Sequence, residues 1–299
     1  MLMRYKLLYI FCIPLQVFVL SFFLQCKARQ PDVSAYTGES VTSVTRVIVD
    51  EEGTTDSDDS EITVSEDIEL DNLLINLLPA PIEDRPEQIL VRNAYVVSYN
   101  KEWKLPNWVA WHLTAEHAEG DSPRTNNFRE DMDVPVPRAT PADYKGSGWS
   151  RGHMCPAGDN KWDAVAMAES FSLINVCPQN ASLNSGLWNS IEIDCRNWAK
   201  RFQDIYIVCG PVFYKQGHEV IGDNEVYVPE AFFKVVLCLN GTPKGMGFVV
   251  KNTAGTKKRD LYYNSIDQVE RITGMDFFPA LPDDIEEEIE SKLDLDQWR

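Results

Sequence analysis

Two short segments carry the residue types that phosphodiester hydrolysis requires. The first, Ser150–Asn160, contains Arg151 and His153, and the second, Pro178–Glu192, contains Asn184. A neutral histidine can take a proton from water near pH 7. An amide oxygen suits a hard cation, and a guanidinium can neutralise phosphate charge. The two segments together therefore predict a metal-assisted phosphodiesterase site.

Each of these residues also has a plainer interpretation that the sequence leaves open. Asn184 stands near the start of a predicted helix, where an asparagine commonly caps the first turn. Glu192 follows eight residues later, about two helical turns, so it shares roughly the same face and could orient a water molecule at the metal. It could equally be a solvated surface carboxylate. His153 alone could be a structural hydrogen-bonding group, and Arg151 could form an ion pair with a nearby acid.

The elements that must position these residues mix strands and helices without strict βαβ alternation, which favours an α+β fold. Apolar runs predict six strands, at 94–99, 108–113, 171–176, 205–210, 231–239 and 245–250. Asn240-Gly241 is a favourable turn for the hairpin formed by the last two. Helical spacing predicts helices at 186–202, 265–273 and 284–293. Residues 118–148 are expected to form a long surface connection that shapes the site.

The acidic residues of this chain are concentrated in its flanks. Of the net charge of −18, eleven negative charges fall between residues 50 and 71, and a net −6 falls in residues 281–299. The rest of the chain is close to neutral, so it can meet nucleic acid without the strong grip that many Lys and Arg contacts provide. We expect an acidic disordered tether and lead-in at 27–84, a folded domain at 85–280 and an acidic C-terminal helix or tail at 281–299.

The first 26 residues have the pattern of a signal peptide or lipoprotein leader. Arg4 and Lys6 precede an apolar run from Leu7 to Leu24, and Cys26 stands where a lipoprotein carries its lipid. An uncleaved membrane anchor is the alternative, because the run approaches the length of a span. The leader predicts an extracytoplasmic protein, secreted, periplasmic or lipid-anchored to the cell envelope, with possible membrane attachment through a lipidated Cys26. Oligomeric state cannot be read from the sequence.

Five cysteines lie beyond the leader, at 155, 177, 195, 209 and 238. They form no C-x-x-C pair, so a zinc site is not predicted. One or two disulfides could form in an oxidising compartment, which would leave at least one thiol free.

In combination, the two chemistry-bearing segments resemble the DNA/RNA non-specific endonuclease family, the ββα-metal nucleases that include endonuclease G and secreted bacterial nucleases. Further blocks that carry the resemblance, in the same order, are 95–100, 106–110, 142–148, 209–211 and 228–234. The resemblance covers about residues 85–280. It implies a ββα-metal nuclease fold, with a mainly antiparallel central sheet flanked by helices.

The resemblance also implies roles for individual residues. His153 is expected to be the general base, Asn184 the ligand of Mg²⁺ and Arg151 the group that stabilises the phosphate charge. Asn175 is expected to line the site, with a buried turn-forming residue as the alternative. The cation could also be Mn²⁺ or another divalent ion. With Glu192 as a further catalytic residue, the resemblance implies an endonuclease that cleaves DNA and RNA without regard to the sugar and leaves 5′-phosphate products.

The chain departs from the family pattern at two positions. Ser150 replaces the Asp that begins the commonest motif, and Asn126 stands where some bacterial members carry a catalytic arginine. Arg124 or Arg129 would have to replace that arginine in binding substrate, and we favour Arg129 because Phe128 could anchor its backbone. Because of these departures, an alternative hypothesis remains. The chain could be a catalytically degenerate family member that acts as an extracytoplasmic nucleic-acid or envelope-partner binding protein. A phosphodiesterase for small substrates is a third possibility.

Overall fold

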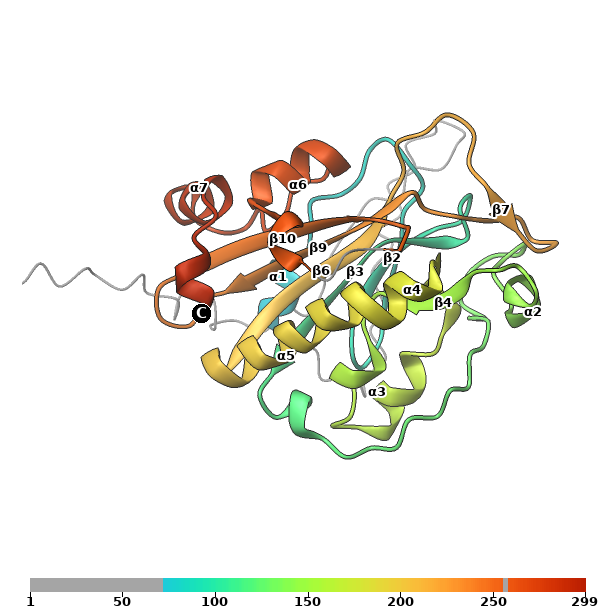
Figure 1. Cartoon of the computed structure of the whole chain (residues 1–299), viewed down its shortest axis with the longest axis horizontal. Coiled ribbons are helices and arrows are strands. Elements are labelled where there is room, and N and C mark those ends of the chain that lie inside the picture. The colour runs from blue at the N-terminus through green and yellow to red at the C-terminus, as the bar shows by residue number, and fades with distance from the viewer. Residues whose placement is uncertain (1–71, 255–257) are drawn as a thin grey trace, which may run out of the picture. The chain divides into compact units, whose positions relative to one another are not determined.

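The computed structural model describes residues 72–254 and 258–299, and its centre is an antiparallel sheet (Figure 1). Its seven strands lie side by side in the order β1 (Gln88–Val91), β2 (Val96–Asn100), β3 (Leu105–Thr114), β6 (Asp204–Val212), β9 (Ala231–Cys238), β10 (Lys244–Lys251) and β11 (Tyr263–Asn264). Every neighbouring pair is antiparallel. The α+β class predicted from the sequence, with a mainly antiparallel central sheet, is confirmed.

The strands are buried on both faces because side chains alternate between two hydrophobic layers. On β6, Ile205 and Ile207 enter one layer, and Tyr206 and Val208 enter the other. Apart from this sheet there are two short strand pairs, β4 (Ser150–His153) with β5 (Val176–Gln179) and β7 (Val220–Ile221) with β8 (Val226–Tyr227). Each face of the central sheet is buried in one of the two hydrophobic layers.

Helices cover both faces of the sheet, as Figure 1 shows. Their bounds are α1 (Asn72–Asn76), α2 (Pro141–Tyr144), α3 (Ala164–Glu169), α4 (Ala181–Leu183), α5 (Asn189–Phe202), α6 (Ile266–Thr273) and α7 (Asp283–Ser291). A π-helical turn, Asn184–Trp188, joins α4 to α5. Short 3-10 turns lie at 117–119, 157–159, 173–175, 259–261 and 295–298. The buried side of α5 faces one apolar layer, and α1, α6 and α7 contribute to the other.

Most predicted elements are present, with one clear exception. Residues 171–176 were expected to be a strand, but Leu173–Asn175 forms a 3-10 turn and the strand begins only at Val176. The apolar run is buried throughout, and burial alone does not distinguish a strand from a tight helical turn. The hairpin turn at Asn240-Gly241 is present, with Gly241 at a φ of 77°.

The folded part extends beyond the predicted 85–280 at both ends. At the N-terminal side, Leu74, Leu77 and Leu78 of α1 and the turn after it are buried against the sheet. At the C-terminal end, Trp298 is buried and its carbonyl oxygen accepts a hydrogen bond from the indole of Trp198, 3.0 Å away. Trp298, near the end of the acidic C-terminal segment, is thus part of the core.

The predicted leader at 1–26, its Cys26 and the acidic stretch up to residue 71 lie outside the described residues. Within the described ranges, no helix combines the length and the apolar character needed to cross a membrane. The cysteines at 155, 177, 195, 209 and 238 are all free and buried, so the disulfides considered possible do not form among them.

Candidate active site

A two-stranded hairpin positions His153 at one end of the sheet. In β4 and β5, Ser150 pairs with Gln179 and His153 pairs with Val176. Gly152 lies between them, and a Cβ there would come within 2.2 Å of the Gln179 side-chain oxygen. The close approach of these two strands therefore requires glycine next to the histidine.

His153 is a buried, neutral histidine whose ring is fixed by aromatic neighbours. Only 7% of the residue is exposed, and its ring lies 5.0 Å from that of Phe171 and 5.2 Å from that of Phe128. Burial, together with the positive charges of Arg124 and Arg151, lowers the pKa of His153 to about 3. Its Nε2 has no hydrogen-bond partner among the described residues. The protein therefore leaves this buried ring nitrogen unengaged.

Asn184 begins the π-helical turn between α4 and α5, and its side chain is not used as a helix cap. Asn180 caps α4 instead, because its side-chain oxygen accepts from the backbone N–H groups of Ser182 and Leu183. No hydrogen bond within the described part of the chain engages the Asn184 amide. Wide π turns recur at functional sites, and this one presents a free amide toward the cleft.

Glu192 lies on α5, close to the cleft that Asn184 also lines. It is partly buried, and burial raises the pKa of Glu192 to about 7, against the opposing charge of Lys234. The amide oxygen of Asn184 and the carboxylate of Glu192 are both hard oxygen donors. These two residues could therefore hold a divalent cation in the cleft.

Two adjoining cavities form one continuous cleft over these residues, because Arg124, Arg151 and Asn184 line both. The inner cavity has a volume of about 340 Å³ and includes His153, Asn189, Glu192 and Arg196 in its wall. The outer cavity has a volume of about 600 Å³ and is lined by Phe128, Pro141, Tyr144, Lys145, Trp149 and Ser150. The cleft thus combines positive charge, hydrogen-bonding groups and aromatic surface.

Arg151 is exposed and has no acidic partner among the described residues, so the ion pair considered as its alternative role is absent. Its guanidinium lies 4.2 Å from the centre of the Phe128 ring. Such stacking orients the group without neutralising it. The guanidinium therefore remains available to a phosphate.

Of the two candidate replacements for the missing arginine, only Arg124 lines the cleft. Asn126 has a left-handed backbone, with a φ of 54°, and its side-chain oxygen accepts a 2.7 Å hydrogen bond from Arg124 Nε. The Arg124 guanidinium also lies 5.1 Å from the Phe171 ring centre. Arg129, which we favoured from the sequence, instead donates a 2.6 Å hydrogen bond to the carbonyl oxygen of Ala168. The sequence-based preference for Arg129 is therefore not supported by its position.

Asn175 does not line the cleft. It is fully buried, and its side chain bonds to the backbone N–H and C=O of Cys155 and to the C=O of Ser170 at 2.8–2.9 Å. All of its polar groups are thus occupied in holding the segment after His153. This position fits the alternative of a buried turn-forming residue, because the asparagine faces inward from the 3-10 turn.

Two basic residues beneath or beside the cleft, Lys234 and Arg196, were not predicted from the sequence. Lys234 of β9 is 1% exposed, and its ammonium lies 4.6 Å and 5.1 Å from the ring centres of Trp111 and Trp188. Arg196 donates a 2.7 Å hydrogen bond to Asp159, which is itself buried. The position of Arg196, four residues after Glu192 on one helix, is the signal that could have identified it. Lys234 gave no such signal within its apolar strand.

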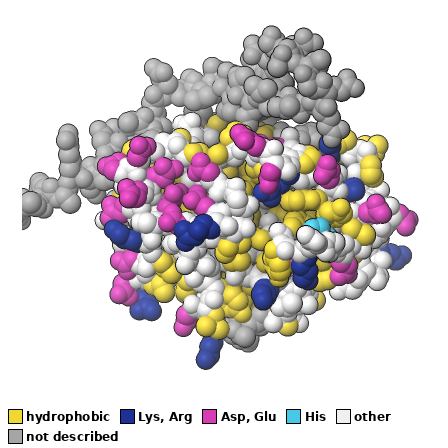
Figure 2. Space-filling model, turned by 90° about the horizontal axis from the view of Figure 1, so that it is seen from above, with side chains coloured by type: hydrophobic (Ala, Val, Ile, Leu, Met, Phe, Trp, Pro, Cys, Tyr) yellow, Lys and Arg dark blue, Asp and Glu magenta, His cyan; other side chains and the backbone are white. Residues whose placement is uncertain are grey.

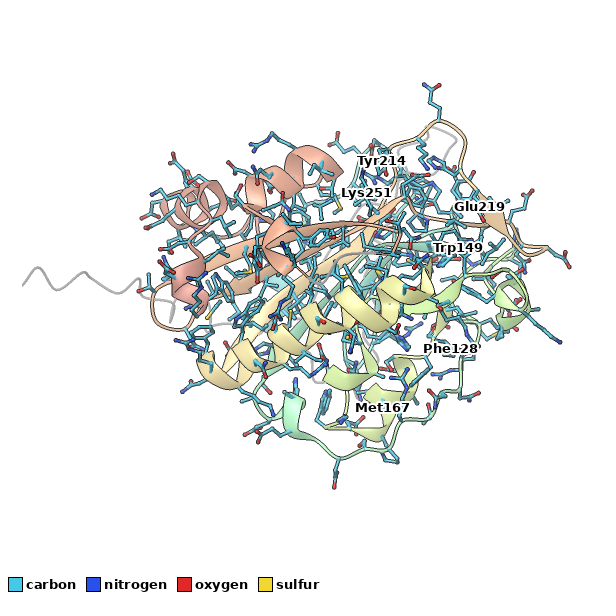
Figure 3. The ribbon with its side chains drawn as sticks, viewed as in Figure 1. Phe128, Trp149, Met167, Tyr214, Glu219 and Lys251 are labelled. Carbon is cyan, nitrogen blue, oxygen red and sulfur yellow. The ribbon has the colours of Figure 1, made fainter. Side chains whose placement is uncertain are left out.

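At the outer end of the cleft, Trp149 and Lys145 add an aromatic ring and a positive charge. The indole N–H of Trp149 donates a 2.8 Å hydrogen bond to Glu219, and Figure 3 shows these two side chains near each other beyond the end of α4. Phe128 lies on the other side of the cleft, toward α3 (Figure 3). Aromatic faces and cations along one groove suit stacked bases and phosphates.

The cleft brings together a buried histidine, a free side-chain amide and the guanidinium groups of Arg124 and Arg151 beside an antiparallel sheet. The sequence profile of the DNA/RNA non-specific endonuclease family matches residues 80–284, and the chain belongs to this family. The predicted family and enzyme class are therefore confirmed. The family consists of divalent-metal-dependent nucleases.

Individual relatives agree with this assignment. The chain is 39% identical over 205 residues to mouse nuclease EXOG, a mitochondrial protein, covering 62% of this chain and 56% of the relative. It is 37% identical to nuclease C1 of Cunninghamella echinulata, covering 64% and 83%, and 34% identical to human mitochondrial endonuclease G, covering 65% and 70%. The chain thus spans a little over half the length of the EXOG proteins it matches.

The fold also matches a solved structure. The crystal structure of the EndoG/EndoGI complex, described as showing the mechanism of EndoG inhibition, contains a chain that aligns with a TM-score of 0.64 at 27% identity. The alignment covers 70% of this chain and 91% of the matched chain. The ββα-metal nuclease fold expected from the sequence is therefore confirmed.

The extracytoplasmic location predicted from the leader is wrong. The EXOG and endonuclease G relatives are named as mitochondrial nucleases, which contradicts the predicted location. The prediction rested on the composition of the N-terminal run alone, an apolar stretch preceded by two basic residues.

Proposed function

We propose that this protein is a divalent-metal-dependent endonuclease that hydrolyses phosphodiester bonds of DNA and RNA. The observation that carries the proposal is the arrangement around His153. A neutral histidine with a free Nε2 lines the same cleft as the unengaged amide of Asn184 and the unpaired guanidinium of Arg151. Membership of a nuclease family and the nuclease relatives support the same activity.

In the proposed mechanism, His153 accepts the proton of a water molecule that attacks phosphorus. Its low pKa keeps the imidazole unprotonated throughout the neutral range, and its aromatic neighbours hold the ring in place. Arg151 and Arg124 stabilise the negative charge that grows on the phosphate oxygens. The 5′-phosphate products are proposed from the family resemblance.

The residues at the inner cavity fit a divalent cation such as Mg²⁺ or Mn²⁺. The Asn184 amide has no protein partner among the described residues, and Glu192 adds a carboxylate to the same wall. Mg²⁺ commonly keeps several waters and takes few protein ligands. A cation held there would stabilise the charge on the leaving 3′ oxygen.

The experiment compares plasmid and RNA digestion by the wild-type protein and by the His153→Ala and Asn184→Ala variants, with Mg²⁺ and then with EDTA. Loss of a general base typically costs about 10²–10⁴ in rate, so His153→Ala should be almost inactive while its thermal melt remains cooperative. Asn184→Ala should lose both activity and Mg²⁺ binding measured by calorimetry. Nucleic acid that is bound but not cleaved by the wild-type protein would favour the degenerate binding protein instead.

A further inference from the structure

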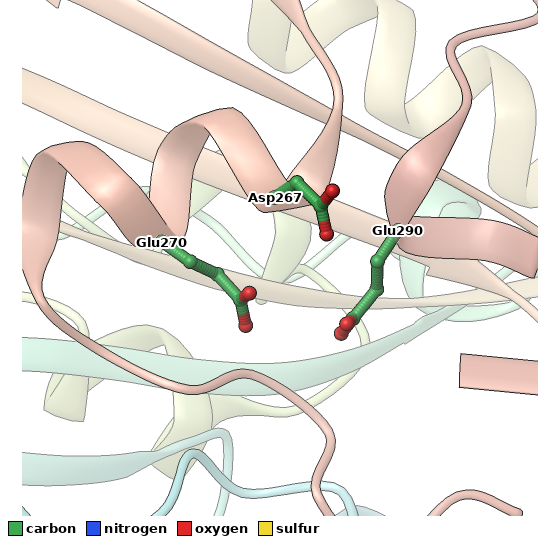
Figure 4. A group of neighbouring side chains, drawn as sticks. All are labelled: Asp267, Glu270 and Glu290. Carbon is green, nitrogen blue, oxygen red and sulfur yellow. The ribbon is translucent and has the colours of Figure 1, made fainter. Parts of the chain in front are cut away.

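Three carboxylates converge between the C-terminal helices, on the layer of the sheet that carries α1, α6 and α7. Asp267 and Glu270 are three residues apart on α6 and therefore share one face. Glu290 reaches them from α7, and the three groups each have an oxygen atom within 4.8 Å of the others. Figure 4 shows the carboxylates of Glu270 and Glu290 directed into the space between the two helices.

Glu290 is the feature that distinguishes this cluster from ordinary surface acids. It is only 8% exposed, and its Oε1 is buried with no hydrogen-bond partner among the described residues. A buried carboxylate without a partner is costly unless a proton or a cation compensates its charge. Figure 4 shows the Glu290 carboxylate in the same space as those of Asp267 and Glu270, where a shared cation would lie.

Among the described residues, Glu290 forms no ion pair. Burial raises the pKa of Glu290 to about 8, and the nearby charges that add to the rise are all acidic, those of Glu270, Glu286, Asp267 and Asp276. Arg271, an exposed residue, stands 3.8 Å from Asp267. Figure 2 shows Asp and Glu side chains gathered on the side of the molecule where α6 and α7 lie in Figure 1.

We propose that Asp267, Glu270 and Glu290 bind a structural Ca²⁺ ion that joins α6 to α7. Ca²⁺ binds oxygen ligands at 2.3–2.6 Å, so two ligands of one ion can be up to about 5 Å apart, which accommodates the observed spacing. Mg²⁺ requires about 2.0–2.1 Å and octahedral geometry, so its ligands can be no more than about 4.2 Å apart and the carboxylates would have to move closer. A small ion also fits a buried carboxylate better than the ammonium group of a partner protein does.

The connection between the helices suits this role. One Glu270 oxygen already accepts a 2.8 Å hydrogen bond from the backbone of Phe277, in the loop that joins α6 to α7. On the inner side, Ile266 and Ile289 pack close to Gly245 of β10. An ion between the helices would therefore stabilise their attachment to the sheet. This position is far in sequence from β4 and β5, which carry His153.

The test measures the thermal melting of the full chain in EDTA and during titration with CaCl₂. Asn184→Ala serves as the background, so that the catalytic cleft does not contribute a cation. Ca²⁺ at ten times its dissociation constant should raise Tm by about 3 to 6 °C. Adding Glu290→Gln should abolish this shift, whereas the matched control Glu288→Gln, an exposed acid on the same helix, should retain it.

Folding of the key variant is not in doubt, because Glu290→Gln removes repulsion and should melt no lower than its parent in EDTA. Calorimetry gives an independent readout, with Ca²⁺ binding lost in Glu290→Gln and kept in Glu288→Gln. An equal Ca²⁺ shift with and without Glu290 would overturn the proposal. An absent shift in the parent, together with a higher Tm for Glu290→Gln, would also overturn it and show that the carboxylates share protons instead.

Discussion

In the folded protein, His153 is buried as a neutral ring. This burial makes the free energy of unfolding depend on pH. Its folded-state pKa of about 3 lies below the ordinary value of about 6.5. The unfolded chain therefore takes up the proton first as pH falls, and the contribution of this residue to stability, complete above pH 6.5, is lost progressively down to about pH 3.

We expect His153→Gln to lose less stability on acidification than the wild-type protein. The difference at pH 5 should be about 2 kcal/mol relative to pH 8, from the separation between pH 5 and the unfolded pKa. Urea unfolding at pH 8, 6 and 5 for both proteins measures it. Parallel loss of stability in the two proteins would show that the histidine is not held neutral.

The two arginines after Pro123 should differ sharply in their effects on catalysis. Arg124→Ala should slow cleavage by about 10²–10³, because its guanidinium lines the cleft where phosphate charge develops. Arg129→Ala should keep its activity and lose about 1 kcal/mol of stability, since it removes one hydrogen bond to Ala168. Rates at saturating Mg²⁺ and melting curves for both variants give the comparison. A slow Arg129→Ala with an unaffected Arg124→Ala would reverse the assignment.

At the level of elements, β9 influences the chemistry of α5 through a single buried side chain. The Lys234 ammonium is the strongest group opposing the raised pKa of Glu192, although it lies on a strand beneath the helix. The sheet therefore contributes to the electrostatics of the cleft as well as supporting it.

We expect Lys234→Met to move the pH profile of kcat to higher pH. Without the ammonium, the pKa of Glu192 rises further, so a larger fraction is protonated at pH 7, and each unit of displacement corresponds to about tenfold in the ionised fraction. Lys251→Met, at an exposed lysine on β10, is the matched control (Figure 3). Activity that is lost equally at every pH would indicate a packing defect.

Elements with a clear period were predictable from the sequence, whereas side-chain directions were not. The strands β3, β6 and β9 were predicted because their apolar runs are long. Spacing suggested one helical face for Asn184 and Glu192, but Asn184 lies in the π-helical turn before α5. Arg129 was preferred over Arg124 because it adjoins Phe128, but the left-handed backbone at Asn126 and a carbonyl at Ala168 decide the directions. The role of Lys234 could not be predicted from the sequence because it depends on contacts between elements that are distant in the chain.

For the molecule as a whole, the short helix α1 is part of the core even though it precedes the segment matched by the family profile. Leu74, Leu77 and Leu78 are 6%, 1% and 6% exposed, and the backbone N–H of Ala80 donates a 2.9 Å hydrogen bond to Asp276. The N-terminal segment thus supports the layer that also holds α6 and α7.

A chain beginning at residue 80 should therefore be less stable than one beginning at residue 72. Exposing the sheet surface that these three leucines cover should cost on the order of 5 kcal/mol. Denaturant unfolding of the two chains, with nuclease activity as a second readout, provides the measurement. Equal unfolding midpoints would show that α1 packs without stabilising the domain.

The five buried thiols have a kinetic consequence. Burial raises the pKa of Cys155, Cys177, Cys195, Cys209 and Cys238, so each is protonated and inaccessible in the native state. A thiol reacts as its thiolate and only where a reagent can reach it. Each cysteine therefore reports the rate at which its own neighbourhood opens. Labelling followed residue by residue would rank the β4–β5 hairpin, helix α5 and the central strands by how often each one opens locally.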